Sequence, residues 1–298
     1  MQTEVTLGGR ENVLGACWMV AAMAAFAIED ALIKVAAAAV PIGQILVIFG
    51  AGGALVFALI AVLRGEPLFV PDVLSPSMLV RVVCEITGRL FYVLAVAFIP
   101  LSTATVILQA TPLVVVIGAV VGFGERVGWR RWVAILIGLA GVVLIIQPGT
   151  EGFSALSWLA VIGMLGFAGR DLASRAAPAT VSTLLLGVYG FLSVVLAGVI
   201  YAVWEGAPFV VPMRDDAAAL GGAVLAGVAA YGFLMKAMRT GEISAVTPFR
   251  YTRLIFGVTL GLLVFGEVLS VPVLLGSLLI VVSGLFILWR GKQASEVS

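Results

Sequence analysis

Apolar runs of about 20 residues recur along the whole chain, and each is long enough to cross a hydrocarbon core about 30 Å thick. Charged residues make up 11% of the 298 positions and hydrophobic residues 62%, whereas a soluble domain carries about 25% charged residues. Because lipid offers no hydrogen-bonding partner, each run should form a helix that satisfies its own backbone. The sequence therefore predicts an all-α integral membrane protein. The ten expected transmembrane helices span residues 13–35, 41–63, 78–98, 100–123, 132–146, 155–173, 181–203, 217–238, 243–265 and 271–289.

Two stretches of the chain are similar to each other, which indicates an internal duplication. Residues 102–125 read STATVILQATPLVVVIGAVVGFGE, and residues 244–267, at a constant offset of 142, read SAVTPFRYTRLIFGVTLGLLVFGE. We expect two repeats, over residues 13–147 and 154–290, with five helices in each. Because five is an odd number, the second repeat should enter the membrane upside down relative to the first. This is the inverted-repeat design of secondary transporters.

The distribution of lysine and arginine predicts that both termini are cytoplasmic. With this orientation most basic residues in loops and at helix ends lie on the inner side, and only Lys34 and Arg214 lie on the outer side. The net charge of +1 and the lack of a basic tract give no indication of a nucleic-acid partner. The chain has no histidine, and Cys17 and Cys84 lie singly in apolar segments. We therefore expect no cofactor and no metal site.

The third expected span carries Glu85, Arg89 and Tyr92 near its centre. Glu85 and Arg89 are four residues apart, so their side chains share one face of the helix. A charge at mid-bilayer costs at least about 2.5–3.5 kcal/mol, and such residues face the bundle interior or a wet cavity. Two interpretations stay open. The residues form a self-neutralising structural pair, or they bind a charged end of the substrate or gate its path.

The ninth expected span carries Arg250 and, about one turn deeper, Arg253. Arg250 could extend its side chain to the cytoplasmic interface, which is harder for Arg253. Either arginine could line the pore or bind a substrate carboxylate. The alternative is an interior salt bridge with Glu85, Asp30 or Asp171.

Two acid–base pairs occupy related positions in the two repeats, Asp30 with Lys34 and Asp171 with Arg175. In each pair the base follows the acid by four residues, and both pairs lie toward helix ends. We interpret them as structural or gating pairs rather than as substrate contacts.

A proline in the middle of the fourth span, Pro112, predicts a kink, because the carbonyl of Leu108 loses its backbone donor. Gln109 beside it adds a polar group at membrane depth. Broken helices with free backbone acceptors mark binding sites in transporters, although kinks also occur for packing. Tyr231, in the eighth span, is a further candidate for a polar group in a cavity.

Each repeat closes its fourth span with Phe-Gly-Glu, at Glu125 and Glu267, and we expect these glutamates to anchor the loops that follow. The fifth helix of each repeat contains paired glycines. This arrangement resembles the EamA branch of the drug/metabolite transporter superfamily over residues 13–290. Within the family it looks closest to the YddG-like amino-acid exporters. The resemblance implies a central cavity between the repeats, peripheral fifth and tenth helices, and export of amino acids or similar metabolites by alternating access.

These features together favour a multi-pass transporter of a bacterial inner membrane that moves small zwitterionic solutes, foremost amino acids. A cavity with both arginine and glutamate would offer each end of a zwitterion an opposite charge, and apolar walls would tolerate varied side chains. The expected partners are the lipid bilayer and the small-molecule substrate, and the duplicated bundle permits a monomer. Coupling stays open, because Glu85 or Asp30 could carry protons but a uniporter needs none.

Other functions remain as alternatives. The same architecture could carry a nucleoside, S-adenosylmethionine or a drug cation, and an anionic cavity without accessible arginine would favour a cation. An intramembrane enzyme is disfavoured, because the sequence contains no Gly-x-Ser-x-Gly, no His-Glu-x-x-His and no phosphate-binding glycine loop. A membrane scaffold would move no solute when purified.

Overall fold

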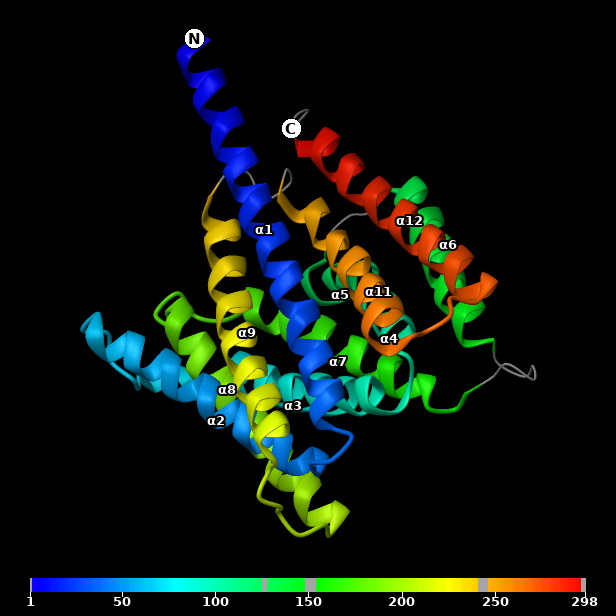
Figure 1. Ribbon diagram of the computed structural model, residues 1–298. Helices are drawn as coiled ribbons and strands as arrows, with labels where there is room; N and C mark the ends of the chain where they lie inside the picture. Colours follow the sequence, from blue (N-terminus) through cyan, green and yellow to red (C-terminus); the bar gives the residue numbers. More distant parts are fainter. Residues whose placement is uncertain (1, 125–127, 148–153, 241–245, 296–298) are drawn as a thin grey trace.

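The computed structural model is built from helices throughout the part of the chain that it describes, residues 2–124, 128–147, 154–240 and 246–295 (Figure 1). Glu125 lies outside the described residues, so the role expected for it stays a prediction. The helices are α1 (Gln2–Ala36), α2 (Ile42–Leu63), η1 (Pro71–Leu74), α3 (Pro76–Phe98), α4 (Leu101–Leu108), α5 (Thr111–Phe123), α6 (Trp129–Ile146), α7 (Ser157–Arg175), α8 (Thr183–Glu205), α9 (Arg214–Arg239), η2 (Thr247–Tyr251), α11 (Thr252–Phe265) and α12 (Val271–Ser295).

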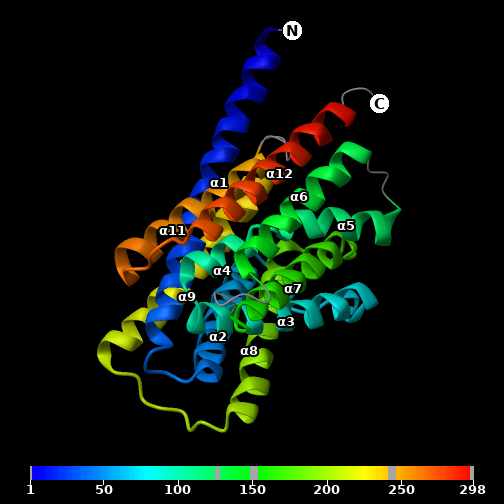
Figure 2. The same ribbon diagram turned by 90° about the vertical axis from the view of Figure 1, so that its right-hand side faces the viewer.

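Each major helix packs mainly on a helix from the other half of the chain. The pairs are α1 with α9, α2 with α8, α3 with α7 and α6 with α12, and α4 packs mainly on α11, which also contacts α1. Exchanging the two halves leaves this set of pairs unchanged, as a two-fold relation between five-helix repeats requires. In Figures 1 and 2, α6 and α12 pack on each other at one side of the bundle, and the start of α1 and the end of α12 lie toward the same end of the molecule.

Six described helical segments are long and apolar enough to cross a membrane by length and composition alone. They include α1, α2, α8 and α9, together with the joined segments α4–α5 and η2–α11, while α6 and α12 contain shorter apolar helices. The helices α3 and α7 do not meet this criterion of length and apolar composition, because both carry several charged residues on the side that faces the bundle interior. Charges placed inside a bundle rather than toward lipid fit a membrane protein with an internal polar site.

Helices α3 and α7 approach each other unusually closely, which brings their charged residues together. A side chain on Gly166 of α7 would collide with the backbone of Gly88 on α3. Small residues at such contacts allow membrane helices to pack backbone to backbone. The glycines therefore set the distance at which the α3 and α7 side chains meet.

The fourth span is interrupted between α4 and α5, as Pro112 predicts. The related ninth span changes at the equivalent position, where the 3-10 helix η2 gives way to α11 after Tyr251, 142 residues beyond Gln109. One expectation is wrong: the carbonyl of Leu108 is not free, because the Thr111 hydroxyl donates a hydrogen bond to it (2.5 Å). This bond replaces the one that proline cannot make.

A threonine hydroxyl also lies at the second interruption, where the carbonyl that it meets already accepts the Thr252 backbone N–H. The Thr252 hydroxyl donates to the carbonyl of Phe249 (2.6 Å), three residues earlier, as Thr111 does in the first repeat. The two interruptions also touch, because the Gln109 side-chain amide donates to the carbonyl of Arg250 (3.2 Å). Two repeat-related helices are thus broken at the same depth and linked to each other there.

Candidate functional site

A cavity of about 560 Å³ lies between the two halves of the bundle. Its wall is formed by α1, α3, α5, α7, α8, α9, η2 and α11, and it borders both helix interruptions. The lining includes every residue that the sequence suggests as a substrate ligand and several of the suggested gating residues. These are Glu85, Arg89, Tyr92, Gln109, Tyr231 and Arg253, together with Pro112, Asp171, Arg175 and Arg250.

Five side chains from three helices form what we call the buried cluster: Glu29 and Asp30 of α1, Arg89 and Tyr92 of α3, and Arg253 of α11. Arg89 Nη1 lies 2.5 Å from Glu29 Oε1, and Arg253 Nη2 lies 2.6 Å from Asp30 Oδ2. The Tyr92 hydroxyl donates to the same oxygen of Asp30 (3.1 Å). Both carboxylates are almost fully enclosed, with 0% exposure for Glu29 and 1% for Asp30.

Aromatic rings enclose the two arginines of the buried cluster. The Arg89 guanidinium carbon lies 4.9 Å from the ring centroid of Phe49 and 5.9 Å from that of Phe167. The Arg253 guanidinium lies 4.9 Å from the ring of Phe26. A desolvated cation over an aromatic face gains about 2 kcal/mol. Each arginine is therefore held by a carboxylate on one side and by rings on the other.

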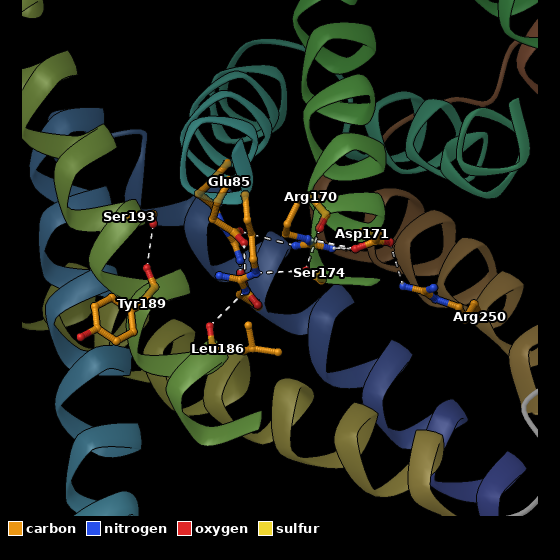
Figure 3. Close-up of polar contacts among 11 residues, drawn as sticks. Glu85, Arg170, Asp171, Ser174, Leu186, Tyr189, Ser193 and Arg250 are labelled. Atoms are coloured by element: carbon orange, nitrogen blue, oxygen red, sulfur yellow. Dashed lines mark hydrogen bonds and ion pairs between the residues drawn. The ribbon is translucent and has the colours of Figure 1, made fainter. Parts of the chain in front are cut away.

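A second group, the cavity cluster, consists of Arg81 and Glu85 of α3, Arg170 and Asp171 of α7, and Arg250 of η2 (Figure 3). Glu85 lies between two arginines, 3.8 Å from Arg81 Nη2 and 3.5 Å from Arg170 Nη1. Arg170 donates through Nε (3.0 Å) and Nη2 (2.8 Å) to Asp171 Oδ1. The other oxygen of Asp171 faces Arg250 Nη2 at 3.8 Å.

The cavity cluster is partly open, in contrast to the buried cluster. The side chains of Arg250 and Asp171 are 34% and 25% exposed, whereas Glu85 is 7% exposed. Arg81 is also tied down, because its Nε donates to the Ser174 hydroxyl (3.0 Å) and its Nη2 to a backbone carbonyl of α8 (3.0 Å). In the described part of the chain, no three Cys, Asp or Glu side chains converge as metal ligands would.

One partner expected from helical spacing is wrong. Glu85 does not pair with Arg89 one turn away, because Arg89 reaches across to Glu29 and Glu85 pairs with Arg81 and Arg170. Arg89 therefore pairs with a charge on a neighbouring helix and not with the charge one turn along its own helix. Arg253 forms one of the interior salt bridges that the sequence left open, the one with Asp30.

Lys34 does not pair with Asp30 either. Its ammonium donates to the carbonyls of Val96 (2.9 Å) and Ile99 (2.7 Å), where α3 ends. A cation beside the last carbonyls of a helix donates hydrogen bonds to them and interacts favourably with the negative end of the helix dipole. Asp171, the repeat-related acid, pairs with Arg170 and Arg250.

Glu267 anchors the start of α4 rather than the loop that follows it. Its carboxylate accepts hydrogen bonds from the backbone N–H groups of Leu101 (2.5 Å) and Ser102 (2.9 Å) and from the Ser102 hydroxyl (2.7 Å). Gly266 ends α11 with φ +61°, a conformation that favours glycine and turns the chain back at this point. The Phe-Gly-Glu sequence thus places an anion at the N-terminus of another helix.

Three charged residues of these clusters are absent from the sequence-based candidates: Glu29, Arg81 and Arg170. All three lie inside expected spans, so the rarity of charge at membrane depth is the signal that identifies them. Arg81 also precedes Glu85 by one helical turn, which is the spacing of an ion pair.

Comparison with known proteins gives a consistent family assignment. Residues 13–147 and 155–289 each match the sequence profile of the EamA-like transporter family. A solved crystal structure superposes with a TM-score of 0.61 over 93% of this chain and 97% of that chain, at 19% identity, which shows the same fold.

Relatives with named substrates differ among themselves. An S-adenosylmethionine uptake transporter of Rickettsia felis is 27% identical over 65% of each chain, so the match spans just under two thirds of that protein. A riboflavin transporter of Rhizobium johnstonii is 30% identical over 73% of this chain and 71% of its own. A pseudopaline exporter of Pseudomonas aeruginosa is 29% identical over 87% and 90%. These names do not confirm the closer likeness to amino-acid exporters, but the chain is a multi-pass membrane protein that belongs to the EamA-like transporter family.

Proposed function

We propose that the protein carries small zwitterionic metabolites, foremost amino acids, across a bacterial inner membrane by alternating access through the cavity between its repeats. The observation that carries the proposal is the charged cavity at the point where two repeat-related helices are broken. In secondary transporters, substrate sites lie near the midplane at the repeat interface and are formed by such discontinuous helices.

The size and walls of the cavity suit a small organic solute. Its volume of about 560 Å³ lies within the range of about 300–1,000 Å³ typical of small-molecule sites. Phenylalanine, leucine, valine and methionine side chains form much of the remaining wall. These residues can accept amino-acid side chains of different shapes, which supports broad specificity.

The charge of the lining favours a solute that carries a carboxylate. Six arginines and two acids line the cavity, and with Glu29 and Asp30 behind them the balance is still six to four. This surplus of positive charge argues against a simple drug cation. The arginines are Arg81, Arg89, Arg170, Arg175, Arg250 and Arg253, and the two lining acids are Glu85 and Asp171.

S-adenosylmethionine is the second candidate, because several relatives are named S-adenosylmethionine uptake transporters. The molecule keeps the ammonium and carboxylate of methionine, so a site built for an amino-acid head group could accept it. The same cavity then serves both candidates, and they differ only in the part of the solute that meets the apolar wall.

Export from the cytoplasm is the direction that we propose, although the named relatives include both uptake and export proteins. The cavity lining extends to Arg81 near the start of α3, Arg175 at the end of α7 and Met238 near the end of α9. If both termini are cytoplasmic, these helix ends face the cytoplasm. The opposite end is closed where Lys34 and Glu267 hold the α3–α4 connection. A monomer facing inward would load its solute from the cytoplasm.

Flux into proteoliposomes tests the proposal. Labelled amino acids and S-adenosylmethionine are supplied outside, with and without a proton gradient, and protein-free liposomes serve as the control. We expect saturable flux of several amino acids. Flux that needs no gradient would indicate a uniporter, and flux that appears only with one would indicate proton coupling. Purified, folded protein that moves riboflavin or no solute at all would contradict a zwitterion carrier.

A further inference from the structure

We infer that Asp171 and Arg250 form the head-group site for the substrate, with the Arg250 guanidinium binding the carboxylate and the Asp171 carboxylate binding the ammonium. This inference rests on the proposed function and assigns each charged end of the zwitterionic substrate to a particular residue. It also excludes Glu85, Arg89 and Arg253 from the head-group site, because each of them forms an ion pair with other side chains of the protein.

Availability separates Asp171 from the other acids near the cavity. Glu29 and Asp30 are enclosed by their arginines, and Glu85 lies between Arg81 and Arg170 with 7% of its side chain exposed. Asp171 uses one oxygen, Oδ1, for both hydrogen bonds from Arg170. Within the described residues, its Oδ2 has only the ion pair with Arg250, at a distance beyond hydrogen bonding. One oxygen of a partly exposed carboxylate therefore remains for a substrate ammonium.

Arg250 is the matching base. Its guanidinium makes no hydrogen bond to the part of the chain that the structure describes, and 34% of the side chain is exposed. Its backbone is held, because the carbonyl of Arg250 accepts a hydrogen bond from Gln109 across the two helix interruptions. A fixed backbone with an uncommitted guanidinium can bind a carboxylate through two parallel hydrogen bonds.

The separation of the two groups fits an amino-acid head. Arg250 Nη2 and Asp171 Oδ2 are 3.8 Å apart (Figure 3), and a partly exposed pair at this distance contributes little to stability. Opening it therefore costs little. An α-amino acid carries its carboxylate and ammonium on one carbon, so its head group can replace the weak direct contact with two charge-assisted hydrogen-bonded contacts.

Arg170 is a positioning residue in this arrangement. It holds Asp171 through Nε and Nη2, and its Nη1 lies near Glu85, so the Asp171 carboxylate is fixed with its second oxygen toward Arg250. Figure 3 shows Asp171 between the two arginines. The site also joins α7 to η2, so a bound substrate would contact an element that lies beside a helix interruption.

A competition experiment with three related compounds tests the inference. L-leucine has both head-group charges, L-leucinamide lacks the carboxylate, and 4-methylpentanoate lacks the ammonium. Each displaces labelled L-leucine from purified protein, and the variants Arg250→Gln and Asp171→Asn are compared with wild type. Arg214→Gln and Asp215→Asn change exposed residues at the start of α9 and serve as matched controls.

In wild type both analogues should bind at least about tenfold more weakly than L-leucine, the effect of one lost hydrogen bond to a charged group. Arg250→Gln should weaken L-leucine about tenfold and bring it level with L-leucinamide, while the penalty on 4-methylpentanoate persists. Asp171→Asn should bring L-leucine level with 4-methylpentanoate instead. Arg250→Lys keeps the charge but not the two parallel donors of the guanidinium. It should retain part of the preference for a carboxylate that Arg250→Gln loses.

The possible failures are distinguishable. If wild type binds L-leucine but both variants keep the wild-type ratios, the head group binds elsewhere and the proposed function stands. If Asp171→Asn binds L-leucine more tightly, Asp171 competes with the substrate and the assignment of the ammonium is wrong. If wild type binds no zwitterion, the proposed function and this inference both fail. Monodisperse elution and a sharp unfolding transition confirm that each variant is folded.

Discussion

The buried cluster and the cavity cluster both combine glutamate, aspartate and arginine but hold their charges differently. In the buried cluster Glu29 and Arg89 are 2.5 Å apart and the glutamate has no exposure. In the cavity cluster Asp171 and Arg250 are 3.8 Å apart and both are partly exposed. A short ion pair with an enclosed carboxylate leaves that carboxylate inaccessible to a ligand, whereas a longer pair with both side chains partly exposed leaves both charges accessible. Distance and exposure therefore separate structural charges from candidate binding charges.

Removal of Glu29 should have the largest effect on folding. Glu29→Ala leaves the Arg89 guanidinium buried without its carboxylate, and breaking a buried pair costs about 3–5 kcal/mol. We expect a large fall in the unfolding temperature of the detergent-solubilised protein, or loss of folded yield. The double variant Glu29→Ala/Arg89→Ala should recover part of this loss, and additive single effects would show that the two side chains do not interact.

Removal of Glu267 should have the next largest effect. Glu267→Ala removes the acceptor of three hydrogen bonds at the start of α4, and we expect a loss of about 2 kcal/mol. Denaturant unfolding measures it, with Glu205→Ala at the end of α8 as a comparison acid that accepts one longer bond (3.3 Å). Equal costs for the two variants would argue against a special role of Glu267 in closing this end of the bundle.

Loss of the Thr111 hydroxyl should have a smaller effect. Thr111→Val keeps the shape of the side chain but leaves the Leu108 carbonyl without its donor, at a cost of about 1 kcal/mol. Thr252→Val is the matched change in the second repeat and should cost less, because the Phe249 carbonyl keeps the Thr252 backbone N–H as a donor. Thermal unfolding of both variants checks this, and a stability equal to wild type would mean that the interruption does not need the hydroxyl.

Loss of the Arg250 charge should change stability least. The Asp171–Arg250 pair is loose and partly exposed, so Arg250→Gln should cost no more than about 1 kcal/mol. A cost near that of Glu29→Ala would place Arg250 with the structural charges and remove the distinction between the clusters. The unfolding temperature of the two variants, measured side by side, decides this.

Much of the fold follows from the sequence because the signals are local or repetitive. Apolar runs give the helices, and the repeat over residues 102–125 and 244–267 gives their division into two sets of five. Pro112 gives the interruption of the fourth span, because a proline in the middle of a long apolar run removes a backbone hydrogen bond that the helix needs there. The residues that line the cavity could also be predicted, since charge at membrane depth is rare enough to mark them.

The partners of those residues could not be predicted. Spacing along one helix suggests Glu85 with Arg89 and Asp30 with Lys34, but the structure pairs Arg89 with Glu29 and Asp30 with Arg253. The rotation of each helix and the close approach of its neighbours decide which charges meet, and neither is written in local spacing. Which charges remain available to a ligand depends on those partners.

One measurement tests both halves of the comparison: the unfolding temperature of wild type and Arg250→Gln, with and without L-leucine. Leucine at about 100 times its dissociation constant should stabilise wild type by about 2.7 kcal/mol. At the same leucine concentration we expect Arg250→Gln to unfold at nearly the wild-type temperature without leucine and to lose about half of the shift with it, since a tenfold weaker affinity leaves about 1.4 kcal/mol. An unchanged shift in Arg250→Gln, or a ligand-free loss as large as that of Glu29→Ala, would contradict the account.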